Sequence, residues 1–188
     1  PYRPGAMPTF LEALAARPLL FDGAMGSLLY DHGVMHTNSY DELNLSRSEL
    51  ILDLHRQYRA AGADVIETNT FGANRLTLAR HGHGDKVAAI NAAGVRLARE
   101  AAATGPGEAS FVAGAIGPTG VNLAIATDAE RTLVRDALAE QIAALAAAGV
   151  DVFVFETFSS ITEIELALHL ASDVAGDVPR IAQVVFDA

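Results

Sequence analysis

The sequence predicts an α/β fold with a parallel sheet, and more specifically the first part of a (β/α)8 TIM barrel. Five short runs are almost continuously apolar, which is typical of strands that are buried on both faces, and stretches of helical periodicity separate them. In addition, one sequence pattern occurs twice, at residues 60–68 and 147–157: the end of a helix, a glycine, a strand, and then Glu-Thr at the carboxyl end of that strand. Repetition of a βα module favours a barrel over a doubly wound sheet.

The predicted strands recur along the whole chain. They are residues 18–21, 64–66, 111–116, 152–155 and 181–186. No G-x-G-x-x-G sequence follows any of them, and a dinucleotide-binding doubly wound fold would be expected to carry one. A complete barrel of this type needs about 250 residues. We therefore expect residues 8–188 to supply about the first five βα units of a truncated or incomplete barrel, after a flexible lead-in or expression remnant at residues 1–7.

The predicted helices lie between these strands. They span residues 46–61, 85–103, 128–148 and 160–174. Ser46 with Glu49, and Ser160 with Glu163, match the capping-box pattern that starts a helix. A glycine follows the first and the third helix, where a residue with a left-handed backbone commonly ends a helix.

Polar residues and glycines follow every predicted strand. They occupy residues 22–27, 67–72, 117–120, 156–158 and 187. In a parallel barrel the carboxyl ends of the strands meet at one rim, where the active site lies. The sequence therefore predicts one shared pocket at this rim.

The residue types at this rim suit a small zwitterion. Asp22 and Glu156 are carboxylates that can accept hydrogen bonds from an ammonium group. Glycines at 23, 26 and 72 allow backbone N–H groups to approach a ligand carboxylate closely. Two simpler interpretations stay open: Asp22-Gly23 is compatible with an ordinary turn. Strand alternation also puts Glu67 and Thr68 on opposite faces, so only one of them would face the pocket.

Composition excludes several classes of function. The formal net charge of −10 argues against nucleic acid or an anionic membrane as the main partner. No apolar run approaches the ~20 residues of a membrane span, and the start lacks a secretion signal, so we expect a cytoplasmic protein. The chain has no cysteine, and its six histidines lack metal-ligand spacing, so the residues predict no metal site and surface positions for the histidines.

Several stretches together resemble the homocysteine S-methyltransferase family. They are residues 22–34, 41–51, 61–82, 90–100, 114–120 and 151–163, beginning with DGAMGSLLYDHGV and ending with DVFVFETFSSITE. The resemblance is greatest to the form fused to a methylenetetrahydrofolate reductase, and next to the homocysteine-binding domain of cobalamin-dependent methionine synthase. It implies a (β/α)8 barrel, a place in methionine biosynthesis and one-carbon metabolism, and homocysteine as a partner. It also implies that a C-terminal reductase domain is a possible part of the same protein.

The resemblance also implies a site. Asp22 and Glu156 would hold the substrate ammonium, groups around Gly23 and Thr68 its carboxylate, and Phe71 would pack nearby. The predicted substrate-binding residues are these five together with Glu67 and Asn69. No catalytic residue is assigned.

The zinc site of the family is the main departure. Family members hold the homocysteine thiolate on zinc through cysteines, and this chain has none. Zinc coordination is what deprotonates a thiol with a pKa near ~8.5, so we expect the chain by itself to be inactive in methyl transfer. The methyl donor stays open among methyltetrahydrofolate, methylcobalamin and a sulfonium or betaine compound. Two alternatives remain: a non-catalytic amino-acid-binding barrel module, and an unrelated metal-independent barrel lyase with Glu156 or Glu67 as general base.

Overall fold

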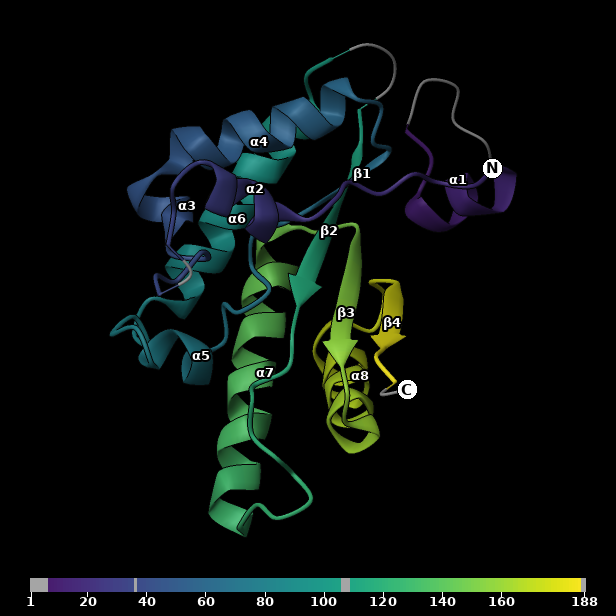
Figure 1. Cartoon of the computed structure of the whole chain (residues 1–188). Helices are drawn as coiled ribbons and strands as arrows, with labels where there is room; N and C mark the ends of the chain where they lie inside the picture. The colour runs from purple at the N-terminus through teal and green to yellow at the C-terminus, as the bar shows by residue number, and fades with distance from the viewer. Residues whose placement is uncertain (1–6, 36, 106–108, 187–188) are drawn as a thin grey trace.

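The computed structural model describes residues 7–35, 37–105 and 109–186, which form a parallel sheet with helices against it (Figure 1). The strands are β1 (Val65–Glu67), β2 (Phe111–Ile116), β3 (Val152–Phe158) and β4 (Arg180–Val184). They pair in parallel in the order β1-β2-β3-β4. The predicted α/β fold and four of the five predicted strands are thereby confirmed. The predictions for residues 1–6 and for Asp187 lie outside the described residues.

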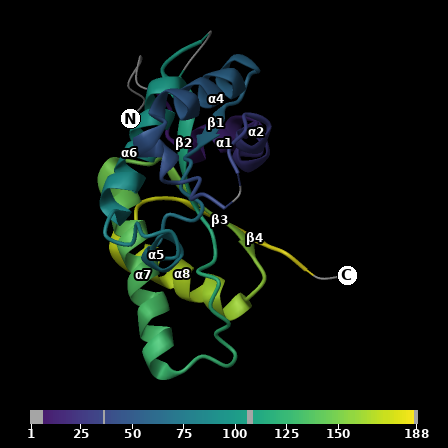
Figure 2. The ribbon, with the colours of Figure 1, turned by 60° about the vertical axis from the view of Figure 1, so that its left-hand side comes forward.

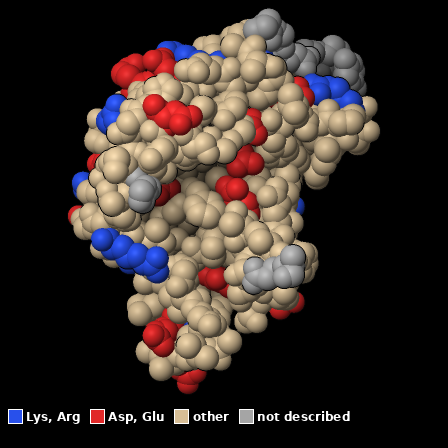
Figure 3. Space-filling model, viewed as in Figure 1, with Lys and Arg blue, Asp and Glu red and all other residues tan. Residues whose placement is uncertain are grey.

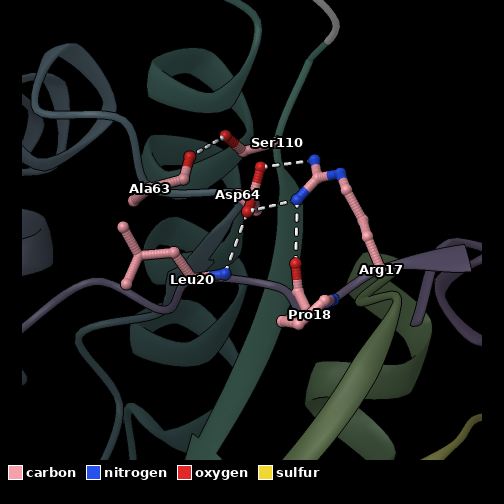
Figure 4. Close-up of polar contacts among 6 residues, drawn as sticks. All are labelled: Arg17, Pro18, Leu20, Ala63, Asp64 and Ser110. Atoms are coloured by element: carbon pink, nitrogen blue, oxygen red, sulfur yellow. Dashed lines mark hydrogen bonds and ion pairs between the residues drawn. The ribbon is translucent and has the colours of Figure 1, made fainter.

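The first predicted strand, residues 18–21, is not a strand. Only Phe21 pairs with β1, through an isolated parallel bridge to Val65. The Asp64 carboxylate holds this segment instead, because it accepts the backbone N–H of Leu20 at 2.9 Å and pairs with Arg17 at 2.7 Å (Figure 4). Backbone hydrogen bonds remain only at the end of the segment, where Leu20 O accepts the Val65 N–H at 3.1 Å and the Asp22 N–H donates to Val65 O at 3.0 Å. Pro18 has no N–H to extend the ladder. The segment nevertheless lies beside β1, as a first strand would.

Eight helices complete the described part of the chain. They are α1 (Phe10–Ala16), α2 (Met25–Asp31), α3 (Leu43–Ser46), α4 (Ser48–Ala60), α5 (Arg75–Ala79), α6 (Val87–Ala102), α7 (Asp128–Ala148) and α8 (Ile161–Ala175). The four predicted helices are confirmed as α4, α6, α7 and α8. None of the helices within the described ranges has the length and apolar character needed to cross a membrane.

The two predicted capping boxes have different outcomes. The box at Ser46 is wrong: α4 begins two residues later, after Arg47, and the Ser46 hydroxyl donates to Glu42 at 2.7 Å. At α8, Ser160 accepts the Glu163 N–H as predicted, but the Glu163 carboxylate does not return the bond. It accepts hydrogen bonds from Thr119 instead, which bears on the site described below.

The main helices cover one face of the sheet (Figures 1 and 2). On this outer face, side chains of β1, β2 and β3 form a continuous apolar core with α6, α7 and α8. The opposite face, which we call the inner face, carries Val65, Val152 and Val154, and Phe10 of α1 packs edge-on against Phe111 there at 5.6 Å between ring centroids. A doubly wound sheet would place its first strand in the middle and helices on both faces. Here the strands follow one another in sequence order, with β1 at one side of the sheet, so the fold is not doubly wound.

Candidate functional site

A cavity of about 700 Å³ opens at the carboxyl edge of the sheet. Figure 3 shows a hollow on this side of the molecule with several Asp and Glu side chains around it. All seven residues of the predicted site line the cavity: Asp22, Gly23, Glu67, Thr68, Asn69, Phe71 and Glu156. The structure thus brings them together from segments 134 positions apart (156 − 22) in the sequence. Their roles in binding stay predictions.

Three carboxyl groups meet in this cavity. Glu67 ends β1 on the same face as Val65, so its side chain lies on the inner face, as strand alternation requires. It hydrogen-bonds the Glu156 carboxyl. Asp22 accepts the backbone N–H of Glu67, at 3.2 and 3.1 Å from its two oxygens. The bond from Glu67 therefore fixes Asp22 beside the other two carboxyls.

Burial and mutual repulsion keep protons on this cluster. Burial raises the pKa of Glu67 to about 8, and the nearby Glu156 and Asp22 charges raise it further. Burial likewise raises the pKa of Asp22 to about 7, and burial also raises the pKa of Glu156, opposed by the hydrogen bond from Glu67. The hydrogen bond between the two carboxyls raises the pKa of Glu67 and opposes the rise at Glu156, which favours Glu67 as the proton donor of the pair. No cation of the described residues contributes to any of these shifts.

An irregular end of β3 directs Glu156 into the cavity. The pairing of β3 with β4 shifts between Phe155 and Phe158. Thr157 lies in this irregularity with φ of 63°, in the left-handed region that a β-branched residue rarely adopts. The extra residue lets Phe158 return to the apolar outer core while Glu156 stays on the inner side with Val154. The strain at Thr157 is thus coupled to the placement of a carboxyl group of the site.

We expect Thr157→Gly to stabilise the fold by about 0.5–1 kcal/mol, because glycine adopts this backbone conformation without steric cost. Thr132→Gly, at an exposed position inside α7, is the matched control and should destabilise by about 0.5 kcal/mol. Urea unfolding of both variants measures the effect. Destabilisation by both variants would show that the Thr157 backbone stores no strain.

Two predicted residues are engaged within the protein. The Thr68 N–H donates to Ala113 O at 2.8 Å, and its hydroxyl accepts the Ala115 N–H at 3.1 Å. The Asn69 amide donates to Tyr40 O at 2.7 Å and to Asn44 Oδ1 at 3.1 Å. These bonds hold the strand end and the neighbouring loop in place. They therefore build the cavity wall, and contact of either residue with a substrate stays a prediction.

Two of the predicted glycines lie against protein side chains, and at Gly72 the predicted use is different in the structure. The Gly72 N–H donates to Asp41 Oδ1 at 2.8 Å, and a Cβ at Gly72 would lie 2.8 Å from the other Asp41 oxygen. A Cβ at Gly23 would lie 2.9 Å from the Tyr58 hydroxyl. Both glycines make room for protein side chains, and at Gly72 the N–H predicted for a ligand is already bonded.

Sequence reasoning missed a second group of cavity residues, namely Tyr40, Asp41, Arg80 and His81. Burial raises the pKa of Asp41 to about 6, and the Gly72 N–H and the His81 charge oppose this shift. His81 is exposed as predicted and lines the mouth of the cavity, whereas His55 on α4 is fully buried, so the prediction of a surface position is wrong for His55. The sequence did contain a signal for these residues. Asp41 begins one of the stretches that resemble the family, residues 41–51, and Arg80 and His81 lie near the end of another, residues 61–82.

The described residues do not offer a zinc site. The chain has no cysteine, and no group of three His, Asp or Glu side chains among the described residues is placed to hold a metal ion. The thiolate donors that the family resemblance implies are therefore not supplied by this chain.

Comparisons with known proteins identify the family of the chain. A sequence profile described as Homocysteine S-methyltransferase matches residues 19–188. A methionine synthase of Mycobacterium leprae (strain TN) is 34% identical over 168 residues, which take in 84% of this chain and 14% of that protein. A methionine synthase of Mycobacterium tuberculosis (strain ATCC 25618 / H37Rv) is 30% identical with the same coverage. This chain thus corresponds to a small part of those enzymes.

Solved structures show the same relationship. The homocysteine methyltransferase MmuM from Escherichia coli matches in its oxidized form with a TM-score of 0.76 and 28% identity, over 90% of this chain and 63% of that one. Its metallated form matches with a TM-score of 0.75, 27% identity and coverage of 90% and 64%. The family profile covers far more than half of the sequence. The chain belongs to the homocysteine S-methyltransferase family.

Proposed function

We propose that this chain forms the homocysteine-binding part of a (β/α)8 barrel domain that transfers a methyl group to the homocysteine sulfur and gives methionine. The single observation that carries the proposal is the cluster of Asp22, Glu67 and Glu156 in one cavity, where no cation of the described residues contributes to the pKa shifts of these carboxyls and Arg80 lines the mouth. Buried carboxyls of this kind require a positively charged partner or a proton. The ammonium group of an amino acid provides that partner.

The barrel assignment rests on the order of the strands. Sequential parallel neighbours with helices on one face are what consecutive βα units of a barrel produce. The chain also covers 63–64% of the matched homocysteine methyltransferase chains. We therefore propose that residues 8–188 form an N-terminal portion of such a barrel, with residues 18–21 taking the place of its first strand.

Binding would replace the proton of the cluster. The ligand ammonium donates hydrogen bonds to Glu156 and Asp22, and Glu67 then loses its proton because the new positive charge lowers its pKa. The carboxylate of the amino acid is assigned to groups around Gly23, as the family resemblance implies. The thiol end of the ligand is left in the open part of the cavity, toward the mouth.

Methyl transfer itself needs more than these residues provide. In the reaction the sulfur forms a bond to the methyl carbon, the bond between that carbon and the donor breaks, and the donor keeps the bonding electron pair. The thiol must first lose its proton. No described residue of this chain is assigned that step, and the zinc ligands of the family are not among its residues. Lack of methyl transfer by this chain alone stays a prediction, as do a fused reductase domain and a cytoplasmic location.

The two alternative functions differ in what they require. A non-catalytic amino-acid-binding module would use the same cluster but show no methyl transfer in the full-length protein. The lyase is not favoured, because the chain belongs to a methyltransferase family. Turnover of a carbonyl substrate by the protein in the absence of metal and thiol would support the lyase hypothesis.

Calorimetric titration of the full-length protein with homocysteine tests the proposal. We expect saturable binding in the wild type and a loss of at least about tenfold in affinity for Glu156→Gln, because a charged hydrogen bond to the ammonium is replaced by a neutral one. Glu165→Gln, at an exposed position of α8, is the matched control and should bind like the wild type. Equal affinities for all three proteins would refute the assignment of the cluster.

A further inference from the structure

We propose that Arg80 forms an anion-binding subsite at the mouth of the cavity, and that it receives an oxyanion group of the methyl donor. This inference rests on the proposed function and deepens it, because it assigns the chemical class of the second substrate. It predicts a donor that carries a carboxylate or phosphate group, which a betaine also does, and it disfavours a sulfonium cation without such a group.

The Arg80 guanidinium is held in place but keeps most of its hydrogen-bonding capacity. Its Nη2 donates to Thr119 O at 3.1 Å. A Cβ at Gly120 would lie 2.8 Å from Nη2 and 3.1 Å from Nη1, so the guanidinium rests directly against this turn. A guanidinium has five N–H donors, and a single carbonyl accepts only part of them. The remaining donors are available to a ligand.

Arg80 has no acidic partner among the ion pairs of the described residues. By contrast, Arg75, five positions earlier, pairs with Glu140, and Arg99 of α6 pairs with Asp151. No such ion pair is found for Arg80 in the described ranges, although it is exposed and lines a cavity. In a chain with a formal charge of −10, an unneutralised guanidinium at a cavity mouth attracts anions specifically to that point.

Hydrogen bonds to a buried side chain of α8 hold the turn that contacts Arg80. Glu163 of α8 is only 3% exposed, and it accepts the Thr119 N–H at 2.8 Å and the Thr119 hydroxyl at 2.6 Å. The carbonyl that orients Arg80 therefore belongs to a residue fixed by two hydrogen bonds to a buried carboxyl group. Glu163, which sequence analysis assigned only to a helix cap, is a positioning residue for this subsite.

The position of Arg80 points to the donor more than to the amino acid. The acidic cluster lies on the half-buried inner face at the strand ends, whereas Arg80 is exposed on the loop beyond α5. A cavity of about 700 Å³ is of the size that holds drug-sized ligands, and a small amino acid leaves much of it free. The donor has to approach the sulfur through this free part.

Titration of the full-length protein with inorganic phosphate and, separately, with glutarate tests the subsite. Each titration is run at constant ionic strength, with and without saturating homocysteine. We expect Arg80→Gln to weaken binding of the preferred anion by about tenfold, in line with loss of a charged hydrogen bond, and to leave homocysteine affinity within about twofold. Arg135→Gln, an exposed control on α7, should change neither affinity. The tighter of the two anions identifies the group that is recognised.

Two results would overturn the subsite. One is unchanged anion affinity in Arg80→Gln. The other is a loss of homocysteine affinity as large as the loss of anion affinity, which would assign Arg80 to the amino-acid carboxylate. Failure of the proposed function is separately visible, because it appears as absence of homocysteine binding to the wild type, while the anion titrations without homocysteine still report on Arg80.

Discussion

Leu138→Ala is expected to lower the free energy of unfolding by about 3 kcal/mol, a typical cost for removing a leucine side chain from a packed core. Leu138 lies on the buried side of α7 with no exposed surface. It belongs to the core that joins the outer face of the sheet to α6, α7 and α8. Because Leu138 is fully buried in a core shared by the sheet and three helices, we expect that a small local movement does not fill the cavity left by alanine.

The same substitution at Leu133 provides the control. Leu133 lies five residues earlier on α7 and is 55% exposed. Both variants replace leucine by alanine inside one helix, so any difference between them comes from burial and not from helix propensity. We expect Leu133→Ala to change stability by no more than about 0.5 kcal/mol. Denaturant unfolding followed by circular dichroism measures both, and equal losses would contradict the described core.

Secondary structure was predictable from the sequence where the residues of a single segment carried the pattern, such as helical periodicity or a terminal glycine. The long helices α6 and α7 show apolar periodicity over many residues, and Gly149 ends α7 with the positive φ that its sequence position predicted. The short helices α1, α2 and α5 have too few turns for periodicity to appear. The first predicted strand failed for a non-local reason, because the Asp64 side chain, 44 positions from Leu20, takes the N–H that a ladder would use.

The candidate site was predictable to the extent that it depends on topology. Parallel strands bring their carboxyl ends to one edge, so Asp22, Glu67 and Glu156 could be placed together without knowing any contact. The details depend on contacts between distant segments. Arg80 reaches Thr119 39 positions away, and no local pattern reports that contact. The irregularity at Thr157 likewise arises from pairing with β4, and a Glu-Thr sequence alone does not reveal it.

Glu67→Gln is expected to stabilise the ligand-free protein increasingly as pH rises, reaching on the order of 1–2 kcal/mol at pH 8. The folded-state pKa of Glu67 is raised to about 8 from an ordinary value of 4.5. Below about pH 4.5 the group is protonated in both states and contributes nothing. Between pH 4.5 and 8 the unfolded chain releases the proton first, so wild-type stability falls with pH through this group. Glutamine removes that loss and can still donate to Glu156.

The informative quantity is the difference in free energy of unfolding between Glu67→Gln and the wild type at each pH. His55 is buried and its pKa is lowered to about 4, so it makes the wild type more stable as pH rises from 4 to 6.5 and opposes the effect of Glu67. Subtracting the wild-type profile removes His55, which is the same in both proteins. Glu165→Gln, exposed on α8, should show a flat difference. A flat difference for Glu67→Gln as well would mean that Glu67 is ionised at neutral pH.

Homocysteine should reverse this pH dependence, because its ammonium group takes the place of the proton. Binding to the wild-type full-length protein at pH 7 is then expected to release up to about one proton. Titrations in buffers of different ionisation enthalpy measure that number, and Glu67→Gln should release fewer protons than the wild type. Release of the same number of protons by both proteins would locate the titrating group outside the cluster. The stability of the empty site and the binding of its ligand thus report on one buried proton shared by Glu67 and Glu156.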